Sequence, residues 1–351
     1  MKWFAVPILA YQRSFLRDLF IILFLFFFQA CVGDNRPVVK IGVSVPNTNT
    51  TSYNLIQKAI FDQLAEHNLT AQSDRIEIIW NSVQDQANGK NAVAMEFQQV
   101  KTMLNQGIKV LVLNSIDSRS AHSILRETKR KSVPVLTLDE PIRNDQIVGH
   151  FSINQSRLGE IAAAYVVQKL KDESLVDKSN VLVLEGPLGS PVFRQLKIGI
   201  YRILDQYPQV HILSKYSKAD KSSGRQLASQ TLRDYAQNVQ AIICVNSGLA
   251  VGAVEGVNLY DMAEKIVTIG IGAERSAINL IIAGQHDAEV DLQSYERGQM
   301  ILQSAIDIYN DQPFQADQEK TQFAPSRIIT TSNYTVLEKI WPDLHSKKIR
   351  K

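Results

Sequence analysis

Short apolar runs alternate with apolar stripes at helical spacing along almost the whole chain. The run Val38–Val45 is typical of a β-strand, and Leu55, Ile56 and Ala59 then recur at the spacing of a helix face. Gly107 stands between a helical stripe and the next apolar run, where a helix C-cap is expected. The same rhythm predicts strands at 76–80, 108–113, 133–138, 147–151, 181–184, 210–213, 241–245, 266–269, 288–290 and 326–330. Helices are predicted at 120–131, 158–170 and 295–309, and another runs through Tyr201.

Strand–helix alternation with nearly continuous apolar strands predicts parallel sheets covered by helices on both faces. The alternation runs through two rounds, so we expect an α/β protein of two doubly wound lobes. No low-complexity linker separates the rounds, which favours a hinge that the chain crosses several times. We assign 38–152 with 293–323 to the first lobe and 153–292 with 324–345 to the second. A ligand cleft is expected between them, at the carboxyl ends of the strands.

The first 31 residues carry an export signal. Lys2, Arg13 and Arg17 precede an apolar run at 19–28, and Ala30 and Cys31 follow it. The run is shorter than the roughly 20 apolar residues of a spanning helix. It resembles a bacterial lipoprotein signal, with Cys31 as the lipidated first residue of a membrane-anchored protein. Ordinary cleavage near Ala30 and an uncleaved anchor are the alternatives, and all three place the remaining chain outside the cytoplasm.

Composition excludes several classes of function. The 351 residues carry a formal net charge of +3, which gives no basic field for nucleic acid. Cys31 and Cys244 are the only cysteines, and Cys244 lies in an apolar run where we expect a buried small hydrophobe. The six histidines show no metal-ligand spacing, so no metal is assigned. No nucleophile–base pair and no phosphate-cradling loop is present, so we expect neither an enzyme nor a bound cofactor.

Several short motifs occur in the order typical of one family. They are KIGVSV at 40–45, NSID at 114–117, VPVLTLD at 133–139, NQSRLG at 154–159, LEGPLG at 184–189 and VNSGLAVGA at 245–253. Together they resemble the periplasmic sugar-binding proteins of the ribose-binding type, which share their fold with the ligand-binding part of LacI-type repressors. The resemblance covers about residues 38 to 333. A repressor is not expected, because an export signal stands where a helix-turn-helix would precede the first strand.

Two candidate ligand residues follow strands at their carboxyl ends. The resemblance implies that Asp139 binds a sugar, and a carboxylate can accept two hydroxyl hydrogen bonds. The alternative for Asp139 is a solvated loop charge. Asn246 either hydrogen-bonds the ligand or caps the helix that follows it.

Further candidates come from the resemblance alone. Arg194 lies in the family's loop–helix segment, although the family's ligand Arg usually falls where this chain has Leu196. Arg194 is therefore either a ligand residue or a surface helix residue. Tyr53 takes the place of the second of two stacking aromatics and Ser52 replaces the first. Tyr53 either stacks on the ligand or packs the start of the helix.

The remaining candidates depart from the family pattern. Glu140 stands where ribose-type sites often have Arg, and in the cleft it would favour an amino-sugar or an amine. Leu292 occupies a common Gln position, where Asp291 and Gln293 are the residues able to substitute.

The resemblance implies an extracytoplasmic, monomeric solute-binding protein. Hinge closure would capture a small polar, sugar-like ligand for delivery to an ABC-type permease. The alternative is a sensor of the same fold, read by a membrane kinase or a chemoreceptor.

Overall fold

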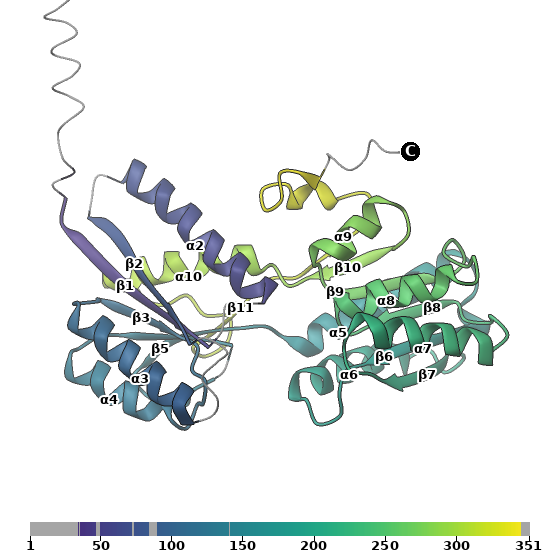
Figure 1. Cartoon of the computed structure of the whole chain (residues 1–351), viewed down its shortest axis with the longest axis horizontal. Coiled ribbons are helices and arrows are strands. Elements are labelled where there is room, and N and C mark those ends of the chain that lie inside the picture. Colours follow the sequence, from purple (N-terminus) through teal and green to yellow (C-terminus); the bar gives the residue numbers. More distant parts are fainter. Residues whose placement is uncertain are drawn as a thin grey trace, which may run out of the picture.

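The computed structural model describes residue 34 and residues 36–46, 50–71, 74–83, 90–139 and 141–344. These residues form two α/β lobes, each built on a six-stranded sheet (Figure 1). The predicted fold class of two doubly wound lobes is confirmed. The export signal and Cys31 lie outside the described residues.

The first sheet is entirely parallel, with the strand order β11-β5-β4-β3-β1-β2. Its strands are β1 (Val38–Val45), β2 (Arg75–Ser82), β3 (Val110–Leu113), β4 (Val135–Leu138), β5 (Ile147–Ser152) and β11 (Thr321–Phe323). The sequence did not predict β11, because its three half-buried residues carry no apolar pattern. Its place in the sheet comes from pairing with β5, where Thr321 lies opposite His150.

Helices cover both faces of the first sheet. They are α2 (Thr51–Thr70) with α10 (Ser294–Tyr309) on one face and α3 (Lys90–Asn105) with α4 (Ala121–Arg130) on the other. Strand β3 shows why both faces are apolar. Val110 and Val112 pack toward α2 and α10, whereas Leu111 and Leu113 pack toward α3 and α4. Gly107 has φ +81°, which confirms the predicted turn after α3.

The second sheet has the order β12-β10-β9-β8-β6-β7, with β12 antiparallel to β10 and the other pairs parallel. Its strands are β6 (Asn180–Glu185), β7 (His211–Tyr216), β8 (Ala241–Cys244), β9 (Val267–Gly272), β10 (Ala288–Asp291) and β12 (Arg327–Ile329). Its helices are α5 (Gln155–Asp172), α6 (Pro191–Leu204), α7 (Lys221–Asp234), α8 (Ser247–Asn258) and α9 (Arg275–Ile282). Cys244 is fully buried in β8, as predicted. Strand β7 extends beyond the predicted 210–213, and the apolar pattern did not mark its last residues because they are exposed at the sheet edge.

The chain passes between the two sheets at three places: after β5, after β10 and between β11 and β12. After β12 the C-terminal segment, which includes the 3₁₀ turn Tyr334–Leu337, packs against α9. It lies beside the crossing segments in Figure 1, in yellow. Its buried cluster also includes Ala59 of α2, and Lys339 pairs with Glu296 of α10, so the segment is linked to elements of both lobes.

Candidate ligand-binding site

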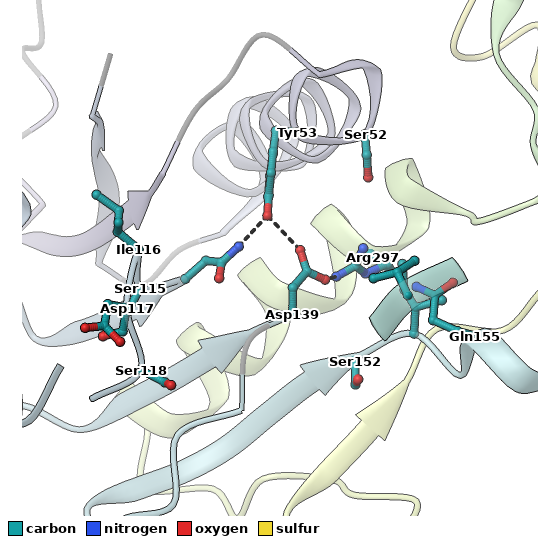
Figure 2. Close-up of a pocket in the computed structure, with 13 residues that line it drawn as sticks. Ser52, Tyr53, Ser115, Ile116, Asp117, Ser118, Asp139, Ser152, Gln155 and Arg297 are labelled. Atoms are coloured by element: carbon teal, nitrogen blue, oxygen red, sulfur yellow. Dashed lines mark hydrogen bonds and ion pairs between the residues drawn. The ribbon is translucent and has the colours of Figure 1, made fainter. Parts of the chain in front are cut away.

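A cavity of about 630 Å³ lies at the carboxyl ends of the first sheet and reaches the second lobe. Most of its lining belongs to the first lobe, and Ile153, Gln155 at the start of α5 and Val192 at the start of α6 come from the second. The lining residues are Ser52, Tyr53, Asn114, Ser115, Ile116, Asp117, Ser118, Asp139, Ser152, Ile153, Gln155, Val192 and Arg297 (Figure 2). The cavity therefore occupies the position predicted for a ligand cleft.

Local structure brings the polar side chains to this edge. Thr50 caps α2 by accepting a hydrogen bond from Tyr53 N, which places Ser52 and Tyr53 in the first turn of the helix. Asn114 follows β3 and Asp139 follows β4. Because neighbouring parallel strands end at the same edge, these side chains meet although they are far apart in sequence.

Four of these side chains form one hydrogen-bonded group, which we call the Asp139 cluster: Tyr53, Asn114, Asp139 and Arg297. The Tyr53 hydroxyl donates to Asp139 Oδ2 at 2.9 Å and accepts from Asn114 Nδ2. Arg297 Nη2 forms an ion pair with Asp139 Oδ1. Figure 2 shows Tyr53 and Arg297 reaching the two carboxylate oxygens from different sides. Both oxygens are thus held in place by side chains of the protein itself.

Burial and charge shape the electrostatics of the cluster. The Arg297 side chain is 1% exposed, whereas the Asp139 side chain is 33% exposed and faces the cavity. Burial raises the pKa of Tyr53 well above its ordinary value, and the negative charge of Asp139 adds to this rise. Tyr53 therefore remains a neutral hydroxyl that donates to Asp139.

A buried carboxylate accepts hydrogen bonds from the loop that follows β3. Glu96 of α3 is 1% exposed and accepts hydrogen bonds from Ser115 Oγ at 2.9 Å and Ile116 N at 3.0 Å. Burial raises the pKa of Glu96, and the two hydrogen bonds oppose the rise. Glu96 thereby positions a loop that forms one wall of the cavity.

The lining is suited to a small hydroxylated molecule. Hydroxyl groups of Ser52, Ser118 and Ser152 and amides of Asn114 and Gln155 supply both donors and acceptors. Asp139 keeps free lone pairs for ligand hydroxyl groups beyond the two it uses in the cluster. Tyr53 is the aromatic residue of the lining, so apolar stacking surface is limited.

The other sequence-derived candidates lie away from this cavity. Arg194 is exposed on α6 and borders a smaller cavity of about 170 Å³ beside Glu185 and Tyr216. Asn246 caps α8: its Oδ1 accepts from Leu249 N at 2.7 Å, and its Nδ2 donates to Ala219 O at 2.8 Å. The side chain of Asn246 is therefore occupied by capping, which is the alternative that the sequence left open.

Asp291 and Gln293 lie at the crossing between β10 and α10. Asp291 accepts hydrogen bonds from Gln293 N at 2.8 Å and from Arg327 Nε at 2.9 Å. Burial raises the pKa of Asp291, and these hydrogen bonds oppose the rise. Both residues are buried and neither lines the cavity of about 630 Å³. Glu140 lies outside the described residues, so its prediction stays open.

Sequence reasoning missed two members of the Asp139 cluster, Asn114 and Arg297. Asn114 lay within a recognised motif but was not named as a site residue. The sequence does contain a pattern that indicates a buried Arg297, because this residue shares a helix face with Ile301 and Ala305, which are buried. An arginine on the apolar face of a helix needs a buried partner, and Asp139 is that partner.

The part of the chain that the structure describes shows neither a membrane span nor a group of metal ligands. No helix in that part of the chain is both long and apolar enough to cross a membrane. Within the same residues, no three His, Cys, Asp or Glu side chains gather where they could hold a metal ion.

The fold and the cavity between its lobes define a two-lobe ligand-binding protein. A family model described as a periplasmic binding protein domain matches residues 41–313, and the chain belongs to this family. The resemblance drawn from the motifs is therefore confirmed at the level of the family.

Individual relatives agree with this assignment. The chain is 24% identical over 296 residues to the ribose import binding protein of Bacillus subtilis (strain 168), covering 84% of this chain and 88% of that protein. A periplasmic ribose ABC transporter structure from Conexibacter woesei DSM 14684 superposes with a TM-score of 0.69 at 16% identity, covering 89% and 98% of the two chains. The fructose-binding periplasmic domain of a hybrid two-component system superposes with a TM-score of 0.63 at 18% identity, covering 88% of this chain and 96% of that chain. At these identities the two structures show a shared fold.

Proposed function

We propose that this protein captures a sugar or sugar-like small polar ligand between its lobes and delivers it to an ABC-type importer. The observation that carries the proposal is the Asp139 cluster, which presents a fixed carboxylate to a cavity lined by hydroxyl and amide groups. Sugar hydroxyls donate well to such a carboxylate. The relative from Bacillus subtilis is a ribose import binding protein, which agrees with this chemistry.

Hinge closure is the proposed mechanism. The chain crosses between the lobes three times, a connection suited to rotation of one lobe against the other. A ligand that contacts both lobes stabilises the closed form, which a membrane partner can then recognise. Val192 of α6 already lines the cavity from the second lobe. Binding without chemistry is sufficient for this role, and the protein is proposed to act as a monomer without a cofactor.

The cellular location of the protein is inferred from its family and from the first 31 residues of the chain. Periplasmic binding proteins act outside the cytoplasm, and the apolar run at 19–28 fits export. We propose that Cys31 is lipidated and holds the protein on a membrane surface. Mass spectrometry of the membrane-bound protein and of Cys31→Ser tests this: an unmodified Cys31 in the mature protein would refute the anchor.

A thermal-shift screen against sugars and polyols tests the capture function. A ligand present at 100 times its dissociation constant stabilises the protein by about 2.7 kcal/mol. We expect a sugar to raise the melting temperature, and Asp139→Asn to remove most of that rise because the neutral amide is a weaker acceptor. Ser222→Ala, on the exposed start of α7, is the matched control and should respond like the wild type. A panel of sugars that leaves the melting temperature unchanged would contradict the proposal.

A second candidate is a periplasmic sensor that signals to a membrane kinase or chemoreceptor. It is favoured by one observation, the shared fold with the periplasmic domain of a hybrid two-component system. Purification of the ligand-loaded protein with its membrane partner separates the two functions. Recovery of a permease supports import, and recovery of a kinase or chemoreceptor supports sensing.

A further inference from the structure

Arg297 is the most deeply buried charged member of the cavity lining. It lies in the first turn of α10, and its side chain is 1% exposed. Asp139 is the carboxylate with which it pairs among the described residues, and its Nε has no hydrogen-bond partner there. An unpaired buried charge is costly, so the arginine and the carboxylate depend on each other.

Close packing of α10 against α2 brings Arg297 to this place. A Cβ atom at Gly298 would lie 2.5 Å from Ile56 O, so only glycine permits the observed approach of the two helices. Arg297 then takes a place on the buried stripe of α10 that also holds Ile301. The position would suit an apolar side chain, and the guanidinium instead lies behind Asp139, on the side away from solvent.

The ion pair leaves the Asp139 cluster with no net charge. Asp117, the other carboxylate of the described lining, accepts hydrogen bonds from Ser120 Oγ at 2.7 Å and Arg119 N at 3.1 Å. Its carboxylate also lies 3.6 Å from Arg119 Nε. The Arg119 side chain is 93% exposed, so Asp139 is the carboxylate of the described lining that has a buried cationic partner.

Charge balance matters most when the lobes close and remove the cavity from water. A neutral ligand would leave the Asp139–Arg297 pair balanced in the closed cavity. An ammonium group would add a charge to an already compensated pair, and burying an uncompensated charge is unfavourable. The pair therefore discriminates by charge even though Arg297 itself need not touch the ligand.

We propose that Arg297 is a positioning residue that fixes the Asp139 carboxylate and compensates its charge, so that the cavity selects neutral polyhydroxylated ligands over amino-sugars and other amines. This proposal rests on the capture function proposed above. It differs from the sequence-derived hypothesis that Glu140, if it faces the cleft, favours an amino-sugar or an amine.

Calorimetric titration with matched ligand pairs tests the proposal. The probes are D-glucose with D-glucosamine and D-galactose with D-galactosamine, which differ by one substituent, together with D-ribose. We expect the purified wild type to bind the neutral member of a pair at least about tenfold more tightly, a difference of about 1.4 kcal/mol. In Arg297→Met the neutral sugar should bind more weakly and the amino-sugar more tightly, whereas Arg297→Lys should keep the wild-type order.

Arg233→Met is the matched control, since Arg233 is exposed on α7 and lies outside the cavity lining. It should leave both affinities unchanged. If Arg297 had only a general structural role, Arg297→Met would weaken the binding of both ligands of a pair. Opposite changes in the two affinities therefore distinguish the proposed role. Wild-type preference for the amino-sugar, or equal losses for both ligands in Arg297→Met, would overturn the proposal and leave the capture function intact.

A ligand-free measurement tests the charge pairing separately. Urea unfolding of Asp139→Asn, Arg297→Met and the double variant forms a mutant cycle. We expect the urea midpoint of the double variant to lie above that of Arg297→Met, because the double variant no longer holds an unpaired carboxylate. Additive losses would overturn the proposal. Recovery in this cycle without binding of any probe would support the pairing and count against the capture function.

Discussion

Asp139 shows how the fold fixes a single residue at the edge of the cavity. Its backbone has φ +60°, a left-handed conformation that is uncommon outside glycine but tolerated by Asp. Its amide N donates to Phe151 O at 2.9 Å, which holds the chain in that conformation. Backbone strain of this kind concentrates at binding and active sites. The chemical type of this residue was readable from its place after a strand, but its conformation was not.

The partners of Asp139 were not readable in the same way. Tyr53 lies 86 positions away in sequence and Arg297 lies 158 positions away. Neither distance leaves a local pattern, so the cluster exists only after the sheet has formed and α10 has docked on α2. Tyr53 was proposed to stack on a ligand or pack a helix start, and the structure adds a third role as a hydrogen-bond donor to Asp139.

Residue His150 gives a prediction about pH. Burial lowers the pKa of His150 below its ordinary 6.5; the charge of Asp139 opposes this and that of Arg297 adds to it. The folded protein therefore keeps this imidazole neutral at a pH where the unfolded chain binds a proton. Its contribution to stability is complete above pH 6.5 and is lost as the pH falls toward the folded pKa.

Urea unfolding at about pH 7.5 and about pH 5.5 measures this effect, with His150→Asn for comparison. Asn keeps a polar group near Thr137 Oγ1, which lies 2.9 Å from His150 Nδ1, but does not titrate. The wild type should lose more stability than the variant between the two conditions. Parallel losses would show that other groups carry the pH dependence.

At the scale of elements, most helices and strands followed from apolar periodicity. The exceptions share a physical cause: β11 and the end of β7 lie at sheet edges, where one side meets solvent and the apolar pattern fades. The loop after β3 is a different case. Its conformation depends on a carboxylate from α3, which no local pattern reveals.

Substitution of Glu96 tests the support of that loop. Glu96→Ala leaves the Ile116 amide without its acceptor and leaves the Ser115 hydroxyl with Asp117 O alone, at an expected cost of about 1–3 kcal/mol in the free energy of unfolding. We also expect weaker ligand binding, because the cavity wall loosens. Glu77→Ala, at an exposed position of β2, is the control and should stay within about 0.5 kcal/mol. Equal stability of the two variants in urea titrations would contradict the supporting role.

At the scale of the whole molecule, the C-terminal segment after β12 links the two lobes. Leu337 is 1% exposed in a cluster that includes Ala59 of α2, Ile278 of α9 and Tyr295 of α10. Lys339 extends this link through an ion pair of 2.7 Å with Glu296 of α10. The segment therefore contributes to how the lobes are held relative to each other, as well as to the second lobe.

Leu337→Ala tests this contribution. Removal of a fully buried leucine should cost about 2–5 kcal/mol in the free energy of unfolding. The adjacent Val336 is 40% exposed, so Val336→Ala should stay within about 0.5 kcal/mol and serves as the control. Urea unfolding followed by circular dichroism measures both. Similar midpoints for the two variants would show that the segment adds little to the stability of the fold.

The sequence by itself determined the fold class, the order of most elements and the presence of a carboxylate at the edge where the cavity lies. These properties depend on local periodicity and on the rule that parallel strands end at one edge. Tertiary structure decided which candidates meet. It joined Asp139 to Tyr53, Asn114 and Arg297, and it placed Arg194 and Asn246 outside the cavity. Contacts between distant segments depend on how helices and sheets pack in three dimensions, and no local pattern along this chain records that packing.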